Sequence, residues 1–337
     1  MKIQIIGFGV IGQGFVEVLL RKGEFLKQRY GLDLKVVSIS DITGTAVEGE
    51  GIDLRRALEV MRQTRGIINY PGARKMTGVE AIEAFEADAV LEVTPSNIQT
   101  GEPGLTHMLK AMGRGKHLVT SNKGPLALRF KALSDAAKKN DVEFGFEASV
   151  GGAMPIINLA KVNLAGDEIL AIEGILNGTT NFILSRMARE ESPFEIVLKE
   201  AREMGIAEAD PSYDIDGIDT AAKLVILANA LMGIDATYRD VKTQGIRKVT
   251  PEAVKLAKED GYAIKLIGEV RNSHLEVAPR LVPVDHPLNV DGILNVALLQ
   301  TDVAGDITVV GKGAGAIETN SAILSDIISI ALKRGRG

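Results

Sequence analysis

The sequence contains no cysteine, and it has only four histidines among its 337 residues. Without cysteine, the chain cannot form disulfides, bind a metal through thiolates or form a thioester on a cysteine nucleophile. Aldehyde dehydrogenases that acylate a cysteine are therefore excluded. The histidines also lack the spacing of metal ligands. If the chain carries out redox chemistry, a side chain other than cysteine or histidine must interact with the oxygen that reacts.

Long apolar runs and long basic blocks are also missing. The first apolar run covers only residues 3–6, which is far too short for the core of a signal peptide or for a membrane span. The formal net charge of -5 argues against a general nucleic-acid-binding protein. We therefore expect a cytoplasmic protein with neither a membrane nor a nucleic acid as a partner.

The hydrophobic pattern changes near residue 150, and the chain is longer than one hydrophobic core usually organises, so we expect two domains. Short apolar runs alternate with amphipathic ones up to about residue 146, which is typical of a parallel sheet with crossover helices. The later part predicts an α+β domain with a mixed sheet. In the first part we expect strands at 2–6, 34–39, 89–93, 117–120 and 142–146, helices at 11–22, 54–65, 101–112 and 125–139, and an exposed loop at 43–52. In the later part we expect strands at 169–176, 263–271, 275–283, 296–301 and 307–310, and helices at 182–189, 194–204, 220–232 and 319–333.

Residues 7–12 match the pattern G-x-G-x-x-G, directly after an apolar strand and at the start of an amphipathic helix. In this context Gly7 permits the tight turn, Gly9 lets a pyrophosphate approach the backbone, and Gly12 allows close packing of the helix on the strand. The helix N-terminus offers free N–H groups and a partial positive charge to the phosphates. The sequence therefore predicts a Rossmann-type domain that binds NAD or NADP.

Asp41 follows the second expected strand, where an acidic side chain can bind ribose hydroxyls and repel a 2′-phosphate. This position favours NAD. Arg55 and Arg56 lie downstream and can instead receive a 2′-phosphate, so the choice between NAD and NADP stays open.

A carboxylate-rich segment at 207–219 leads into a helix that is apolar nearly all round, which predicts a buried helix. Asp219 and Lys223 stand one turn apart on the same face of this helix. A buried ammonium is costly unless it is paired, so Lys223 needs a reason to be there. Its pairing with Asp219 predicts a functional site, although Asp219 can also simply stabilise the helix dipole.

Two further segments end expected strands, at the edge where open α/β sheets bind ligands. Thr94 follows one strand and Lys123 follows the next. A lysine at that edge can contact the cofactor or a substrate oxygen, or it can be a solvated loop residue. Adjacent glycines at 151–152, after the last strand of the first part, expose backbone groups or form a hinge.

In this order, the motifs of the chain resemble those of homoserine dehydrogenases. The resemblance covers essentially the whole chain, and the carboxylate-rich segment is its most specific part. The matching motifs are the N-terminal glycine motif, T-S-N-K at 120–123, E-A-S-V-G-G at 147–152, L-N-G-T-T-N at 176–181, the segment E-x-D-P…D-G-I-D-x-x-x-K at 208–223, and G-K-G-A-G at 311–315.

This family interconverts homoserine and aspartate semialdehyde with NAD(P), and the resemblance implies roles for individual residues. Lys223 matches the catalytic lysine, with Asp219 one helical turn before it, and Lys123 matches the lysine beside the nicotinamide. Glu208 matches the glutamate that holds the substrate ammonium, while Gly178, Thr179 and Asp214 fall in the substrate site. The implied cofactor contacts are Gly7, Phe8, Gly9, Val10, Ile11, Gly12, Asp41, Thr94, Lys123 and Gly315. The implied ligands of a monovalent cation, Na⁺ or K⁺, are Glu147, Val150, Gly152 and Met154, largely through backbone carbonyls.

The resemblance also implies an architecture. Residues 1–146 with 316–337 form the dinucleotide-binding domain, and residues 147–315 form the substrate-binding domain and the interface of a homodimer. Because the chain ends at residue 337, we expect no C-terminal domain that senses threonine. Two alternatives remain: another Rossmann oxidoreductase, of the sugar-dehydrogenase or dipicolinate-reductase type, and a nucleotide sensor without catalytic activity. The first gives no reason for the Asp219–Lys223 helix, and the second predicts no turnover.

Overall fold

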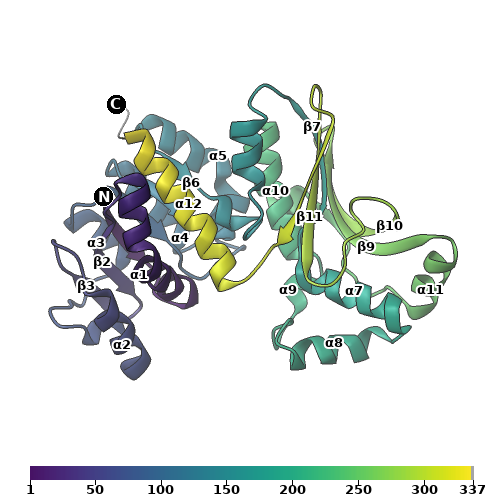
Figure 1. The fold of residues 1–337 in the computed structure, drawn as a ribbon, viewed down its shortest axis with the longest axis horizontal. Coiled ribbons are helices and arrows are strands. Elements are labelled where there is room, and N and C mark those ends of the chain that lie inside the picture. The colour runs from purple at the N-terminus through teal and green to yellow at the C-terminus, as the bar shows by residue number, and fades with distance from the viewer. Residues whose placement is uncertain (335–337) are drawn as a thin grey trace. The chain divides into compact units, whose positions relative to one another are not determined.

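The computed structural model describes residues 1–334 of the chain. The chain divides into two compact units (Figure 1). The first unit comprises Met1–Gly152 and the C-terminal segment from Gly315, and the second comprises Ala153–Ala314. Each unit has its own six-stranded sheet, and this agrees with the predicted α/β class.

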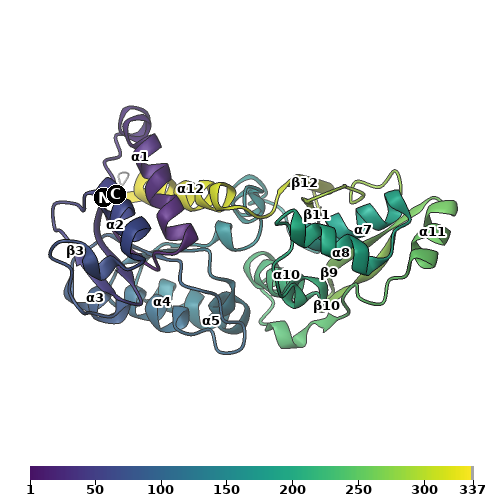
Figure 2. The same cartoon turned by 90° about the horizontal axis from the view of Figure 1, so that it is seen from below.

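The sheet of the first unit has the strand order β3-β2-β1-β4-β5-β6. All neighbouring strands are parallel except β2 and β3, which are antiparallel. Figure 2 shows α1 and α12 on one side of this sheet and α3, α4 and α5 on the other. Its strands are β1 (Lys2–Ile6), β2 (Lys35–Asp41), β3 (Gly44–Val47), β4 (Ala89–Glu92), β5 (His117–Thr120) and β6 (Phe144–Gly145). Its helices are α1 (Val10–Tyr30), α2 (Leu54–Thr64), α3 (Gly78–Ala84), α4 (Gly104–Gly113), α5 (Lys123–Lys139) and α12 (Ala316–Arg334).

The C-terminal helix α12 completes the core of the first unit. Its buried Ile323, Ile327 and Ile330 recur every three or four residues, so they share one face of the helix. They belong to the same apolar cluster as Phe15 and Leu19 of α1. The last segment of the chain is therefore part of the hydrophobic core that supports the first strand and helix.

The glycine-rich stretch 43–52 is not an exposed loop throughout, so this expectation was wrong. Residues Gly44–Val47 form β3, which pairs with β2 and is largely buried. The hairpin forms because the Asp41 carboxylate accepts hydrogen bonds from the backbone N–H groups of Thr43 (2.6 Å) and Gly44 (3.3 Å). A side chain at Gly44 would also collide with the backbone, since its Cβ would lie 2.6 Å from the carbonyl oxygen of Arg74.

The second unit has a mixed sheet, as the sequence predicts, and its strand order is β12-β11-β7-β9-β10-β8. Only β8 and β10 run parallel. Helix α10 covers one face of this sheet. A Cβ at Gly268 on β9 would contact Thr220 and Leu224 of that helix. Its strands are β7 (Ile169–Ile175), β8 (Lys242–Thr243), β9 (Tyr262–Arg271), β10 (His274–Pro283), β11 (Leu294–Thr301) and β12 (Asp306–Lys312). Its helices are α6 (Ile156–Asn158), α7 (Gly178–Glu190), α8 (Phe194–Glu203), α9 (Ser212–Ile215), α10 (Ile218–Met232) and α11 (Pro251–Glu259).

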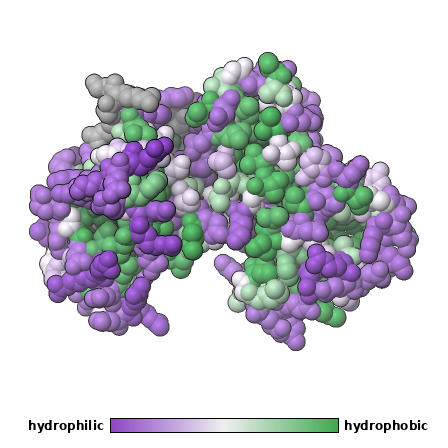
Figure 3. Space-filling model, in the orientation of Figure 1, coloured by the Kyte–Doolittle hydropathy of each residue, from purple (hydrophilic) through white to green (hydrophobic). Residues whose placement is uncertain are grey.

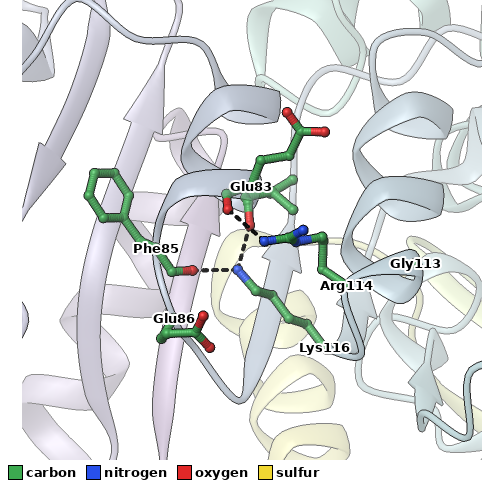
Figure 4. A pocket seen from close by; sticks show the side chains of 7 residues that line it. Glu83, Phe85, Glu86, Gly113, Arg114 and Lys116 are labelled. Carbon is green, nitrogen blue, oxygen red and sulfur yellow. Dashed lines mark hydrogen bonds between the residues drawn. The ribbon is translucent and has the colours of Figure 1, made fainter.

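A small pocket of about 260 Å³ in the first unit contains a buried lysine, Lys116, which Figure 4 shows among the lining residues. The ammonium of Lys116 donates to the carbonyl oxygens of Ile82 and Phe85, both at 2.6 Å, and to Oε1 of Gln4 at 2.8 Å. Burial lowers the pKa of Lys116 to about 8. Because three acceptors match its three protons, Lys116 joins β5 to β1 and α3 and is a structural lysine.

None of the helices within residues 1–334 is long and apolar enough to cross a membrane.

Candidate active site

The three glycines of the N-terminal motif serve different purposes in the structure. Gly7 has φ = 102°, and a Cβ there would lie 2.6 Å from the backbone of Val93. A Cβ at Gly12 would lie 2.2 Å from the carbonyl oxygen of Gly7. A Cβ at Gly9, in contrast, would meet no protein atom within 4 Å. Gly7 and Gly12 are thus required by the packing of the turn, whereas Gly9 leaves space above the N-terminus of α1.

The side chains between these glycines point in different directions. Phe8 is buried in the core of the first unit, Ile11 is partly buried against that core, and Val10 is 75% exposed. Because its side chain is buried, Phe8 can contact a ligand only through its backbone. Gly315, another predicted cofactor contact, directly precedes α12 and has φ = 128°. This positive φ favours glycine, whereas the carboxylate of Glu318, 2.2 Å from a Cβ placed at Gly315, ends a flexible side chain that can move.

The turn after β1 lies where the strand order reverses, since β2 and β4 flank β1 on opposite sides. Ligands of open α/β sheets bind at such a position. A fully buried carboxylate, that of Glu92, organises this edge. It accepts hydrogen bonds from both the backbone N–H and the hydroxyl of Thr94, and from Nδ2 of Asn122 at 3.2 Å. Asn122 caps α5, whose first residue is Lys123. The structure therefore brings Thr94 and the backbone of Lys123 to the edge next to Gly7.

The carboxylate of Asp41 is bound to its own turn and to a neighbouring segment. Besides the backbone N–H groups of Thr43 and Gly44, its Oδ1 accepts the hydroxyl of Thr43 at 2.5 Å. Its Oδ2 accepts the backbone N–H of Ile67 at 2.9 Å. The negative charge is at the predicted place, the end of β2, but both oxygens already have partners. Arg55 and Arg56 are exposed in the first turn of α2.

Three of the four predicted cation ligands lie in the first unit and one in the second. Glu147 and Val150 are buried, and the backbone N–H of Glu147 donates to Oδ2 of Asp326 at 3.0 Å. Gly152 has φ = 55°, and Met154 is buried in the second unit. Within residues 1–334 no group of three or more histidine, aspartate or glutamate side chains is arranged to hold a metal ion. The predicted ligands are mainly backbone carbonyl oxygens rather than side chains of these kinds.

The second unit contains a buried ion pair on α10. Nζ of Lys223 lies 2.8 Å from Oδ2 of Asp219, one helical turn earlier. The same ammonium donates to the carbonyl oxygen of Leu176 at 2.7 Å. Lys223 is 5% exposed and Asp219 is 3% exposed, so water does not solvate this pair as it would at the surface. The burial that the apolar helix predicted is confirmed, and the lysine is charge-paired within a largely apolar environment.

The structure also reveals a residue that the sequence reasoning missed. Asn177, which follows β7, donates hydrogen bonds from Nδ2 to Oδ1 of Asp214 at 2.7 Å and to Oδ2 of Asp219 at 2.9 Å. Its own Oδ1 accepts the backbone N–H of Thr180 and caps α7. The sequence signal was present, because asparagine is a preferred cap at the start of a helix. Asp219 lies 42 residues further along the chain, so the sequence alone does not indicate that Asn177 also binds this carboxylate.

The N-terminus of α7 and the carboxylate-rich segment meet at this place. Burial raises the pKa of Asp214, and the nearby charge of Asp219 raises it further, while hydrogen bonds from Asn177 and Thr179 oppose the rise. The hydroxyl of Thr179 also donates to the carbonyl oxygen of Ile206 at 3.2 Å. The structure thus brings together Lys223, Asp219, Asp214 and Thr179.

Two other predicted substrate residues flank this cluster in the chain. Gly178 opens α7, and a Cβ there would lie 2.7 Å from the carbonyl oxygen of Ile293. Glu208 is exposed in the segment between α8 and α9, two residues after Ile206. Chemically, the cluster offers a cation, two carboxylates, a hydroxyl and the N-terminus of a helix. Such a set can bind a small polar molecule and stabilise negative charge on an oxygen atom.

Comparison with known proteins identifies the family of the chain. Two family profiles match the chain: one described as the NAD binding domain of homoserine dehydrogenase over residues 7–147, and one described as homoserine dehydrogenase over residues 155–328. The homoserine dehydrogenase of Methanocaldococcus jannaschii is 56% identical over 331 residues, which cover 98% of both chains. These matches confirm the resemblance inferred from the motifs.

Two further relatives differ in the coenzyme that their names give. The NAD(+)-dependent homoserine dehydrogenase of Pseudomonas canavaninivorans is 36% identical over 337 residues, which cover 98% of this chain and 96% of its own. A solved structure of a hyperthermophilic archaeal homoserine dehydrogenase in complex with NADPH superposes with a TM-score of 0.85. It is 31% identical and covers 98% of each chain. Similarity alone therefore leaves the coenzyme preference of this chain undecided.

The geometry of the glycine motif predicts different effects for two alanine substitutions. Gly9→Ala adds a Cβ in space that no protein atom occupies, and φ at Gly9 is -81°, which alanine adopts readily. We expect this variant to unfold at the wild-type temperature and to bind NADH or NADPH at least about tenfold more weakly, because the methyl group blocks the pyrophosphate. Gly12→Ala is the comparison, and its clash should lower the free energy of unfolding by about 1–3 kcal/mol. Coenzyme affinity is measured by fluorescence titration. A wild-type affinity in the Gly9→Ala variant would contradict the assignment of Gly9 to coenzyme binding and of Gly12 to packing.

Proposed function

The chain belongs to the homoserine dehydrogenase family, and we propose that its buried Lys223–Asp219 pair interacts with the reacting oxygen of homoserine. The reaction interconverts L-homoserine and L-aspartate 4-semialdehyde, a step that supplies threonine and methionine biosynthesis. When bound, NAD(P) would supply the redox chemistry by taking up a hydride from the carbinol carbon in the oxidative direction. The hydroxyl group on that carbon gives its proton to a water molecule, which carries it to the solvent, so negative charge develops on the oxygen as the proton leaves.

Lys223 is suited to stabilise this charge. Its ammonium is held by a carboxylate and a carbonyl oxygen, so it is oriented before the substrate arrives. A preorganised cation in a site that excludes water stabilises an oxyanion more strongly than water does. Asp219 keeps the ammonium in place, and we assign Lys123 a second contact with the reacting oxygen or the nicotinamide.

The remaining groups of the cluster are proposed to hold the amino-acid end of the substrate. We assign Glu208 to the ammonium of homoserine, because its carboxylate is exposed and carries the opposite charge. Gly178, Thr179 and Asp214 are assigned to the polar groups of the substrate near the N-terminus of α7. Binding the far end of the substrate fixes the position of the carbinol carbon, which contributes to the rate through orientation.

The coenzyme is proposed to bind along the edge formed by the ends of β1 and β4. The open space at Gly9 and the N-terminus of α1 fit a pyrophosphate. Thr94, Ile11, Gly315 and the backbone of Phe8 and Val10 are assigned to further contacts. We also propose that backbone carbonyl oxygens near Glu147, Val150, Gly152 and Met154 hold a monovalent cation, as the resemblance to the family implies.

We propose that two copies of the chain associate through the second unit and that the enzyme works in the cytoplasm. Figure 3 shows hydrophobic side chains gathered over the strands β7, β11 and β12. Val310 on β12 is 48% exposed, Leu281 on β10 is 60% exposed, and Val303 in the turn after β11 is 77% exposed. Apolar side chains at these positions favour burial against a second copy, which would supply the same surface.

The proposed role of Lys223 predicts a loss of turnover with retention of coenzyme binding. In an assay with homoserine and NAD or NADP at alkaline pH, the wild type should form reduced coenzyme, followed at 340 nm. We expect Lys223→Ala to lower kcat about 10²–10³-fold or more, because a preorganised charge at the oxyanion is removed. The matched control is Lys116→Met, a second buried lysine, which should affect stability but not kcat. If Lys223→Ala keeps more than a third of wild-type turnover, this assignment is wrong.

The charge of Asp41 predicts a preference for NAD. The variant Asp41→Asn keeps an oxygen that can accept the N–H of Thr43, gives up the hydrogen bond from the N–H of Ile67, and removes the charge that repels a 2′-phosphate. We expect the ratio of kcat/KM for NADP to that for NAD to rise about tenfold. The control is Asp53→Asn, which removes an equal charge at the cap of α2 and should leave the ratio unchanged. If Asp41→Asn leaves the ratio of kcat/KM for NADP to that for NAD unchanged, Arg55 and Arg56 are better candidates for the residues that set coenzyme preference.

A further inference from the structure

Asn177 has a fixed orientation in the second unit. Its side chain is 5% exposed, and it lies between the end of β7 and the start of α7. The backbone N–H of Thr180 can only donate, so the Asn177 atom 2.9 Å away must be the amide oxygen. The amide nitrogen of Asn177 must then face the opposite side.

The atoms on that opposite side are two carboxylate oxygens. Oδ1 of Asp214 lies 2.7 Å from Nδ2 of Asn177, and Oδ2 of Asp219 lies 2.9 Å from it. An amide nitrogen has two hydrogens, so each carboxylate receives one. Hydrogen bonds to a charged acceptor are about twice as strong as those between neutral groups. Asn177 therefore separates two like charges and binds both.

The backbone around Asn177 connects the remaining groups of the cluster. The carbonyl oxygen of Leu176, the preceding residue, accepts a hydrogen bond from Lys223. Gly178 and Thr179, the two following residues, open α7. One stretch of four residues thus contacts the lysine and both carboxylates and contains two of the proposed substrate contacts. A change at position 177 alters the position of Asp219 relative to the N-terminus of α7.

We propose that Asn177 is a positioning residue for homoserine oxidation, which holds Asp219 and Asp214 so that Lys223 faces the reacting oxygen. This inference rests on the proposed role of Lys223 and adds the group that aligns it. The titratable groups that face Asn177 are Asp214 on α9 and Asp219 on α10, with Lys223 bound to the latter. The hydrogen bonds from the Asn177 amide favour the ionised form of both carboxylates.

Two variants separate this role from the cap of α7. Asn177→Asp is nearly isosteric and still accepts the N–H of Thr180, but it replaces the donor with a third negative charge. We expect kcat/KM for homoserine to fall at least about 100-fold. The added charge raises the pKa of Asp214 and Asp219, so the acidic limb of the pH–kcat profile should move to higher pH by about one unit. Asn177→Ser also retains a capping group. It cannot bridge both carboxylates, and we expect at least a tenfold loss of kcat/KM with a smaller shift in the same direction.

The control is Asn229→Asp, at the other end of α10. Asn229 is also a buried amide, but within the described residues 1–334 its side chain hydrogen-bonds to the backbone of Ala236, through both its oxygen and its nitrogen. This variant should lower the thermal unfolding midpoint and leave kcat/KM per folded molecule and the pH profile within about twofold of wild type.

The inference is overturned if both Asn177 variants keep the wild-type pH profile and lose activity only in proportion to the folded fraction. If Asn177→Asp does not fold, the Asn177→Ser profile decides in the same way. Failure here remains distinct from failure of the proposed function. An inactive Lys223→Ala variant together with a normal Asn177→Ser profile would reject only Asn177, whereas an active Lys223→Ala variant would reject the role of the lysine itself.

Discussion

The buried ammonium of Lys223 is the constraint around which the site of the second unit is arranged. A charge removed from water is stable only where it is paired and hydrogen-bonded. Here Asp219 supplies the opposite charge and Leu176 supplies a carbonyl oxygen. Because these partners come from α10 and from the residue after β7, they hold the first turns of α10 next to the end of that strand. Asn177 then connects the same pair to Asp214 and to the start of α7.

Two other buried lysines show what distinguishes Lys223. Lys116 is surrounded by two carbonyl oxygens and a side-chain amide. Lys265 donates to Asn181, Ser185 and the carbonyl oxygen of Val290, and its carboxylate partner Asp291 is itself 67% exposed. Both join neighbouring elements. Among these three lysines, Lys223 alone is paired with a carboxylate that is also buried, and this pair adjoins an N-terminal helix end. That combination suits charge stabilisation in a reaction better than it suits stability.

The sequence predicted well those features that depend on local pattern. The apolar strand before Gly7, the all-round apolar helix of Lys223 and the spacing of the isoleucines in α12 each express one periodicity, and the structure contains all three. The pairing of Asp219 with Lys223 was also predictable, because residues four apart on a helix are neighbours. The small helix α3 was missed, although Thr77 and Glu80 form the capping box that marks its start.

Long-range contacts were beyond what the sequence pattern could give. Nothing in the sequence indicates that Asp41 binds Ile67, or that residues 44–47 pair with β2 rather than remain a loop, since glycine-rich composition alone predicts flexibility. The bridging role of Asn177 depends likewise on two carboxylates far along the chain. The sequence of residues 177–180 predicts that Asn177 caps a helix. That Asn177 also bridges two carboxylates becomes evident only in the folded structure.

The central claim is that the buried pair serves the reaction rather than stability, and the most direct test is a comparison of unfolding free energies in a double-mutant cycle. Lys223→Met and Asp219→Asn would be measured singly and together by denaturant unfolding. Each single variant leaves a buried charge without its partner and should lose about 3–5 kcal/mol, whereas the double variant should return to within about 1 kcal/mol of wild type. All three should have lost turnover of homoserine. A double variant that is no more stable than either single one, or that still oxidises homoserine, would contradict the account.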